Sequence, residues 1–209
     1  MNASDALPDE LPLLLLHGVV VFPLTVTPLA VSRPASVRMV DDAVAGTGVV
    51  AVATQRNGED SGFFAVGVAA RVHRLVRLHD GTLRIALEAF ERIAIGELLQ
   101  RAPYPRARVQ PLPDVATDAT TGPLLAQEAL ARAHELLDAM PGGSDELRAQ
   151  LDAADPRRLT ALLASTLLLH AGIAERQALL ELPGPDERLQ RLYVLLAQEL
   201  AALRGHLRI

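Results

Sequence analysis

Lysine and cysteine are both absent from this sequence of 209 residues, and aromatic side chains make up only 3% of it. Without cysteine there is no disulfide and no thiolate metal site, which is typical of a reducing compartment. The absence of lysine excludes a phosphate-binding P-loop, a Ser-Lys catalytic dyad and a Schiff base. Half of the residues are hydrophobic, so the core must be built from Leu, Val, Ala and Ile.

The charge balance gives no general reason to bind a polyanion. The net charge is −5, and all twenty basic residues are arginine. A negative chain is repelled by nucleic acid on average, although local arginine clusters leave such binding open. The length allows one large domain or two small ones with a sizeable core.

An apolar stretch, LPLLLLHGVVVFPLTVTPLAV, occupies residues 11–31. A signal peptide needs a basic region before its apolar core, whereas the flank here, MNASDALPDE, holds three acids and no base. A membrane-spanning helix needs about 20 uninterrupted apolar residues. Pro12, Pro23 and Pro28 interrupt this run, and a proline inside a helix costs about 3 kcal/mol. The stretch therefore predicts the first strand of a soluble, cytoplasmic protein.

The first half of the chain has a strand-like pattern. A helix is expected from Pro34, with Val37, Val40 and Val44 on one face. The clearest signal is Asp80-Gly81 between two alternating runs, which indicates a β-hairpin. The other apolar runs predict strands at residues 13–22, 49–54, 93–95 and 106–112, with extended chain at 29–31. Several short strands with one helix predict a partly closed β-barrel.

The second half is helical and follows a segment rich in Pro, Asp and Thr. Asp155-Pro156 is a helix start, because Asp is a good cap and Pro suits the first turn. Helices are expected at residues 124–140, from 144, from 156 to about 170, at 175–181 and at 186–207. The predicted class is α+β, and the predicted divisions are a disordered N-terminus (1–10), a β domain (11–113), a linker (114–122) and a helical bundle (123–209).

Two motifs come close to known functional patterns. His134-Glu135-Leu-Leu-Asp138 is one residue short of the zinc-protease pattern H-E-x-x-H, which needs a second imidazole one turn away. A solvated helix face is the better interpretation. The run from Gly46 to Ala51 matches G-x-G-x-x-A, but a dinucleotide site needs a strand before it and a helix after it. The expected order here is the reverse, so we interpret the run as a helix end and a turn.

The other candidate residues give no catalytic or metal site. The six histidines, at positions 17, 73, 79, 134, 170 and 206, show no ligand spacing. Asp41-Asp42 is interpreted as a helix end, Glu59-Asp60 as a loop tip, and His170 as a boundary or hydrogen-bonded core residue. Phe63 and Phe64 are expected to pack in the core. Catalytic, cofactor-binding and metal-binding residues are predicted to be absent, and substrate-binding residues stay unassigned.

The order of several short segments resembles the N-terminal region of the ATP-dependent protease Lon. The family begins with LPLLPLR-x-x-V-x-FP and PL-x-V-x-R-x-x-S, and continues with G-x-x-A and DGT-x-R-x-x-x-E-x-x-x-R. The matching residues in the first half are Leu11-Pro12-Leu13-Leu14, Val20-Val21-Phe22-Pro23, Pro28-Leu29, Val31, Arg33, Ser36, Gly67, Ala70, Asp80-Gly81-Thr82, Arg84, Glu88, Arg92, Pro103-Tyr104, Ala107 and Val109. Those in the second half are Asp155-Pro156, Leu159, Gln177, Leu179-Leu180-Glu181, Arg188-Leu189 and Glu199-Leu200. The resemblance covers about residues 11–209.

Four positions depart from the family pattern. Leu15 stands where the family has Pro, and His17 where it has Arg. Leu24 replaces the Gly after Phe-Pro, and Ala89 replaces the Gly of a Glu-Gly turn. These are packing or turn positions, so they bear on local loop shape.

The resemblance implies a PUA-like β-barrel followed by a helical bundle that captures unfolded or tagged proteins and supports hexamer assembly. It implies that the chain is not itself an enzyme and holds no cofactor. ATP, Mg²⁺ and the serine endopeptidase would belong to a longer parent protein, of which this would be an N-terminal fragment, because the last helix gives no stop signal. A stand-alone protein-binding module and a PUA-like nucleic-acid binder are the alternatives. No membrane partner is expected.

Overall fold

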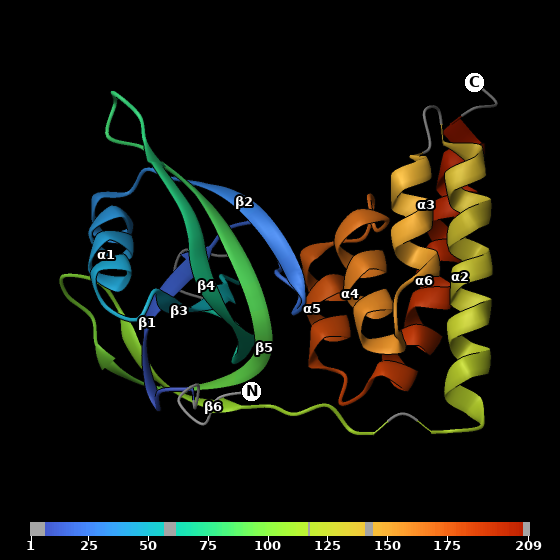
Figure 1. Ribbon diagram of the computed structural model, residues 1–209, viewed down its shortest axis with the longest axis horizontal. Coiled ribbons are helices and arrows are strands. Elements are labelled where there is room, and N and C mark those ends of the chain that lie inside the picture. The colour runs from blue at the N-terminus through green and yellow to red at the C-terminus, as the bar shows by residue number, and fades with distance from the viewer. Residues whose placement is uncertain (1–6, 57–61, 117, 141–143, 207–209) are drawn as a thin grey trace. The chain divides into compact units, whose positions relative to one another are not determined.

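Residues 7–56, 62–116, 118–140 and 144–206 are described by a computed structural model. The chain divides into a strand unit, Met1–Pro113, and a helical unit, Asp114–Ile209. The strand unit contains β1 (Glu10–Leu16), β2 (Thr25–Val31), α1 (Pro34–Ala45), β3 (Val49–Thr54), β4 (Val66–Arg77), β5 (Leu83–Gln100) and β6 (Arg106–Pro111) (Figure 1). The helical unit contains α2 (Thr121–Ala139), α3 (Asp145–Asp152), α4 (Pro156–Thr166), α5 (Ile173–Glu181) and α6 (Pro185–His206). The α+β class predicted from sequence is confirmed.

A single sheet curls into a partly closed barrel in the strand unit. Its strand order is β2-β5-β4-β3-β1-β6, and β6 also pairs with β5. The pair β1–β3 is parallel and the other pairs are antiparallel. The first half of β5 pairs with β2 and its second half with β6, so this strand of 18 residues closes the barrel (Figure 1).

The strand expected at residues 93–95 is the second half of β5. A register shift opposite Ala69 and Ala70, and others between β5 and β6, bend the strand and allow one long strand to serve two neighbours. The hairpin between β4 and β5 is where the Asp-Gly signal placed it. Gly81 has φ 84°, and its N–H donates to Leu78 O at 3.0 Å.

The barrel core is aliphatic because alternate residues of its strands face inward. Its buried residues are Leu11, Leu13, Val49, Ala51, Ala53, Ala69, Ile93, Ile95, Ala107 and Val109. Helix α1 packs against β1 and β3. It buries Met39, Val40 and Ala43 but leaves Val44 exposed. The prediction that Val44 lies on the buried face is therefore wrong, and Ala43 takes that place.

The strand expected at residues 13–22 ends early, at Leu16. Gly18 follows with φ 72°, a left-handed conformation that turns the chain out of the strand. The next strand, β2, begins at Thr25 and is longer than the extended segment expected at 29–31. Ala89, expected in a turn, lies buried within β5 and pairs with Thr25 and Ala70, since the strand runs through this position without reversing.

Leu24 is the one non-glycine residue with positive φ, 61°, among the described residues. Leu24 is 39% exposed, so its contacts are only partly buried. A left-handed conformation costs a residue with a Cβ about 1–2 kcal/mol. The family has glycine at this position because glycine adopts a positive φ without this cost.

Replacing Leu24 by glycine is expected to stabilise the strand unit by about 1 kcal/mol, because the strain exceeds the lost contacts. Urea unfolding of the two proteins measures the difference. Leu29→Gly, at ordinary strand geometry in β2, is the matched control and should lower stability. A loss of stability in Leu24→Gly would show that its side-chain contacts outweigh the strain.

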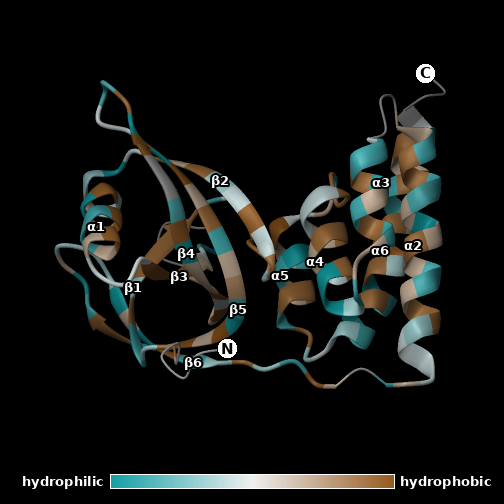
Figure 2. Cartoon of the chain, viewed as in Figure 1, coloured by the Kyte–Doolittle hydropathy of each residue, from teal (hydrophilic) through white to brown (hydrophobic). Residues whose placement is uncertain are grey.

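The described residues of the helical unit form the predicted five helices, one of them shortened. Asp155 caps α4 by accepting the N–H of Arg158 at 3.0 Å. That helix ends at Thr166 instead of near His170, and Leu169 is exposed. The core is made by one face of each helix, which gives α2 and α6 their mixed hydropathy in Figure 2. Its most buried residues include Ala129, Ala133, Leu163, Leu179, Leu189, Leu192 and Leu196.

Candidate functional site

The strand β2 lies at the edge of the sheet. Among the described residues it pairs only with β5. Edge strands present unpaired N–H and C=O groups to a partner chain. Leu24, just before the strand, and Val26, near its start, are 39% and 63% exposed and present apolar side chains. Pro28 lies within the strand, as is typical of an edge. This edge is able to accept an extended peptide.

A groove of about 330 Å³ lies beside the same strand. It is lined on one side by the second half of β1 and the loop after it, and on the other by the second half of β2 and the first turn of α1. We call it the β1–β2 groove. Its lining residues are Leu14, Leu15, Leu16, His17, Val19, Leu29, Ala30, Val31, Ser32, Arg33 and Ser36.

The β1–β2 groove has mostly apolar walls and one cationic side chain, that of Arg33, in its lining. Leu15, Leu16 and Leu29 are half-buried, so each still presents apolar surface. His17 and Arg33, both exposed, are the titratable residues of the lining, and no carboxylate lines it. Apolar side chains of a bound segment would find burial here while its backbone pairs along β2. His17 and Leu15, two of the departures from the family pattern, lie in this lining.

A second cavity of the strand unit, about 320 Å³, has charged side chains in its lining that contact one another or neighbouring polar groups. The Tyr104 hydroxyl donates to Asp42 Oδ2 at 2.9 Å, and Arg106 Nε lies 3.2 Å from Glu10 Oε1. Burial raises the pKa of Tyr104, and the bond to Asp42 raises it further. Because its charged groups pair with one another, this cavity offers less to a ligand than the β1–β2 groove.

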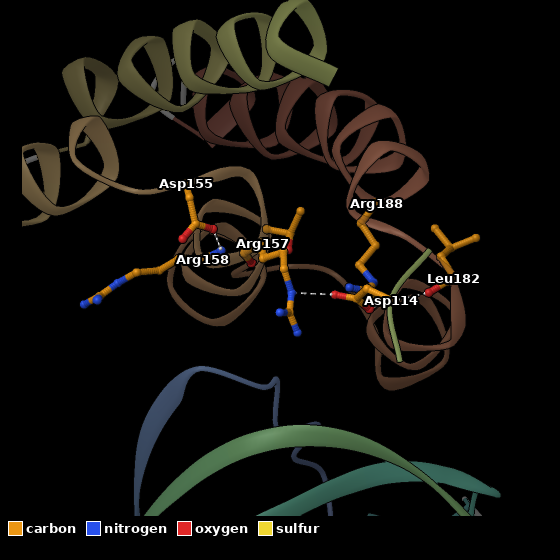
Figure 3. A network of polar contacts seen from close by, with 7 residues as sticks. Asp114, Asp155, Arg157, Arg158, Leu182 and Arg188 are labelled. Carbon is orange, nitrogen blue, oxygen red and sulfur yellow. Dashed lines mark hydrogen bonds and ion pairs between the residues drawn. The ribbon is translucent and has the colours of Figure 1, made fainter. Parts of the chain in front are cut away.

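The start of the expected linker is fixed to the helical unit. Asp114 accepts hydrogen bonds from Arg188 at 2.7 Å and Arg157 at 3.0 Å, as Figure 3 shows. Arg188 also donates to the carbonyl of Leu182 at 2.7 Å. Asp114 and Arg188 side chains are only 9% and 4% exposed. Sequence reasoning missed this network, because an Asp that follows a proline in a polar segment gives no sign of its partners.

Asp118 accepts hydrogen bonds from the backbone at the N-terminus of α2, two residues before the N-cap residue Thr120. Its Oδ1 accepts the N–H groups of Thr121 at 2.7 Å and Thr120 at 2.9 Å. These bonds, that from Thr121 first, lower the pKa of Asp118 because they favour the charged carboxylate. Because the pKa of Asp118 is lower in the folded state than in the unfolded state, its charged carboxylate stabilises the fold above the unfolded-state pKa. This contribution is lost as the pH falls through the folded-state pKa.

Asp118→Ala is expected to destabilise the helical unit at neutral pH, and the difference from wild type should shrink below about pH 4, near the ordinary Asp pKa. Chemical unfolding at a series of pH values, followed by circular dichroism, measures it. Asp145→Ala, an exposed acid in the first turn of α3, is the control. A difference that stays constant with pH would contradict the charged cap.

The sequence motifs occupy ordinary surface positions. His134 Nε2 lies 3.1 Å from Asp152 Oδ1, and Glu135 is exposed and accepts from Arg132 at 2.7 Å. Within residues 7–56, 62–116, 118–140 and 144–206, His, Asp and Glu form no group of three suited to a metal. The G-x-G-x-x-A run lies between α1 and β3, so a helix precedes it and a strand follows, as predicted. Gly48 makes the turn with φ 71°.

The remaining candidates are held by local partners. His170 Nδ1 lies 2.6 Å from Glu199 Oε2, and Glu199, 4% exposed, also accepts the N–H of His170 at 2.8 Å. Phe63 packs on the barrel core, and Phe64 lies under the guanidinium of Arg56 at 4.9 Å. Asp41 accepts two bonds from Arg77, and His73 contacts Glu88. His17 and His79 are exposed. Glu59-Asp60 and the side chain of His206 lie outside the described residues.

No helix of the part that the structure describes has the length and hydrophobicity to cross a membrane.

Comparison with known proteins gives one consistent result. Residues 10–198 match the family model of the ATP-dependent protease La (LON) substrate-binding domain. Lon protease 1 of Herpetosiphon aurantiacus is 36% identical over 98% of this chain and 26% of its own length. Lon protease of Trichlorobacter lovleyi is 32% identical over 92% of this chain and 24% of its own. The chain spans about a quarter of the length of these curated relatives.

Solved structures show the same fold. The N-terminal domain of a Mycobacterium avium complex Lon protease superposes with a TM-score of 0.74 at 21% identity, covering 90% of this chain and 98% of that one. A Lon N-terminal domain protein from Xanthomonas campestris gives a TM-score of 0.63 at 23% identity, covering 88% and 97%. The resemblance stated from sequence is confirmed.

Proposed function

This chain belongs to the family of Lon substrate-binding domains, and from that premise we propose that it recognises unfolded or damaged proteins for an ATP-dependent Lon-type protease. The observation that carries the proposal is the family match over residues 10–198. An apolar groove beside an open strand edge gives the proposal a physical site.

The chemistry of an unfolded client suits the β1–β2 groove. Such a client exposes apolar side chains and unpaired backbone groups that a folded protein buries. The groove accepts the former through Leu15, Leu16 and Leu29, and the edge of β2 pairs with the latter. Backbone pairing is indifferent to sequence, so a surface of this kind selects for the unfolded state more than for one motif.

Catalysis, in this proposal, lies outside the chain. The absence of lysine supports it, since neither a Ser-Lys peptidase nor a P-loop ATPase works without one. ATP, Mg²⁺ and hexamer assembly would then belong to the longer protease, whose relatives are about four times the length of this chain. We place this protease in the cytoplasm, in keeping with a chain that has no cysteine.

Leu29→Glu tests the site. A carboxylate in an apolar groove costs its desolvation, so binding of a labelled, reduced and carboxymethylated protein should weaken roughly tenfold in fluorescence anisotropy. Leu124→Glu, at an exposed leucine of α2, is the matched control and should bind like wild type. Equal weakening in both variants would remove the groove from the proposal, and no binding by wild type would overturn the proposal itself.

A further inference from the structure

The chain is anchored on both sides of the junction between its units. In the strand unit, the N–H of Leu112 donates to Arg92 O at 2.8 Å. In the helical unit, the Asp114 carboxylate accepts from Arg188 and Arg157. Pro113 is the single residue between these two fixed points.

The segment after the junction is fixed as well. The N–H of Val115 donates to Pro183 O at 3.1 Å, and that of Asp118 to Asp186 Oδ2 at 2.7 Å. A Cβ on Gly184 would stand 2.8 Å from Glu187 Oε2 and 3.3 Å from Val115 O, so the segment lies close against the start of α6. The first residues of the expected linker at 114–122 are therefore bound to the helical unit.

We propose that the junction is a hinge of one residue, Pro113, and that the ion pair between Asp114 and Arg188 is the latch that keeps it short. Proline has a fixed φ, so rotation at this residue is confined to ψ. The buried ion pair is the strongest anchor, because breaking it leaves the guanidinium of Arg188 buried without a counter-charge. The Val115 bond, by contrast, is a single hydrogen bond between neutral groups.

Opening the latch leaves only the single Val115 bond before Asp118, and once that bond also opens the chain is free as far as Asp118. Each extended residue spans about 3.3–3.6 Å, so four more free residues add roughly 14 Å of reach. The latch thus sets the range over which the strand unit moves relative to the helical unit. This inference concerns the connection alone and stands whether or not the β1–β2 groove binds clients.

Distance measurement by pulsed electron paramagnetic resonance tests the hinge. The chain has no cysteine, so Glu97→Cys in the strand unit and Gln127→Cys in the helical unit, both exposed, take one spin label each. The latch is removed by Asp114→Ala with Arg188→Met, which leaves no buried charge behind. The width of the distance distribution should rise about twofold over wild type as the tether lengthens.

The matched control is Asp138→Ala with Arg148→Met, an exposed pair at 2.8 Å within the helical unit, which should leave the width unchanged. Four glycines inserted between Pro113 and Asp114 lengthen the tether with the latch intact and should broaden the distribution as the latch variant does. A wild-type width equal to that of the insertion variant would overturn the hinge, and a latch variant as narrow as wild type would overturn the latch.

Hydrogen exchange of the unaltered chain is an independent measurement that does not depend on any variant folding. The amides of Val115 and Asp118 should exchange at least about tenfold more slowly than an unstructured chain, because both are hydrogen-bonded. Unprotected exchange at these two amides would overturn the proposal.

Discussion

Gly67→Ala is expected to destabilise the strand unit by about 3 kcal/mol or more, the largest effect of any single methyl group added here. A Cβ at this position would lie 2.2 Å from Val52 O and 3.2 Å from Val52 C, and 3.0 Å from Ile95 Cδ1. The first two are backbone atoms of the neighbouring strand β3. They move only if the β3–β4 ladder breaks, so the structure has no inexpensive way to make room.

The matched control is Gly96→Ala, in β5. The nearest atoms to a Cβ there are Arg108 O at 3.6 Å and Arg108 Cβ at 4.0 Å, which are ordinary contacts. This variant should be neutral or more stable by about 0.5–1 kcal/mol, because alanine loses less backbone entropy than glycine.

Urea unfolding followed by tyrosine fluorescence separates the two glycine variants. The chain has two tyrosines, so in a Tyr193→Phe background Tyr104 reports on the strand unit alone. A similar loss in both variants would show that glycine is required for flexibility and not for space. Gly67 is also the glycine of the family's G-x-x-A segment, and the close approach of Val52 explains why that position has no Cβ.

Asp114→Ala is expected to destabilise the helical unit by about 3–5 kcal/mol, because it leaves the guanidinium of Arg188 buried without its carboxylate. Arg188 is 4% exposed, and its remaining acceptor in the network is the carbonyl of Leu182. Asp114→Ala combined with Arg188→Met should lie within about 1–2 kcal/mol of wild type, because a well-packed apolar group replaces the charge at little cost.

The double-mutant cycle isolates this coupling. Tyr193 fluorescence in a Tyr104→Phe background follows unfolding of the helical unit, and each single variant is compared with the pair. The exposed pair Asp138–Arg148 should give a coupling of at most about 1 kcal/mol in the same assay. Additive effects at Asp114 and Arg188 would mean that the two side chains contribute independently and that their ion pair is not a latch.

Local signals determined much of the fold. Asp80-Gly81 placed the hairpin, and Asp155-Pro156 placed the start of α4, because a turn and a cap depend on a few neighbouring residues. The expectations that were wrong depended on distant partners. The strand at residues 93–95 is part of β5 because β2 and β6 share that strand, and Val44 is exposed because β1 and β3 cover a neighbouring face of α1.

The sequence by itself determined the class, the five helices of the second half and the family, because these follow from periodicity, turn residues and the order of short motifs. Only the tertiary structure decided where the β1–β2 groove lies and that Asp114, 74 residues before Arg188, is its partner. Among the described residues β2 pairs on one edge alone, with β5, which leaves room for the groove. The ion pair forms because packing brings the first residue of the helical unit beside α6. Both are contacts between residues far apart in the chain, and no local preference of the polypeptide encodes them.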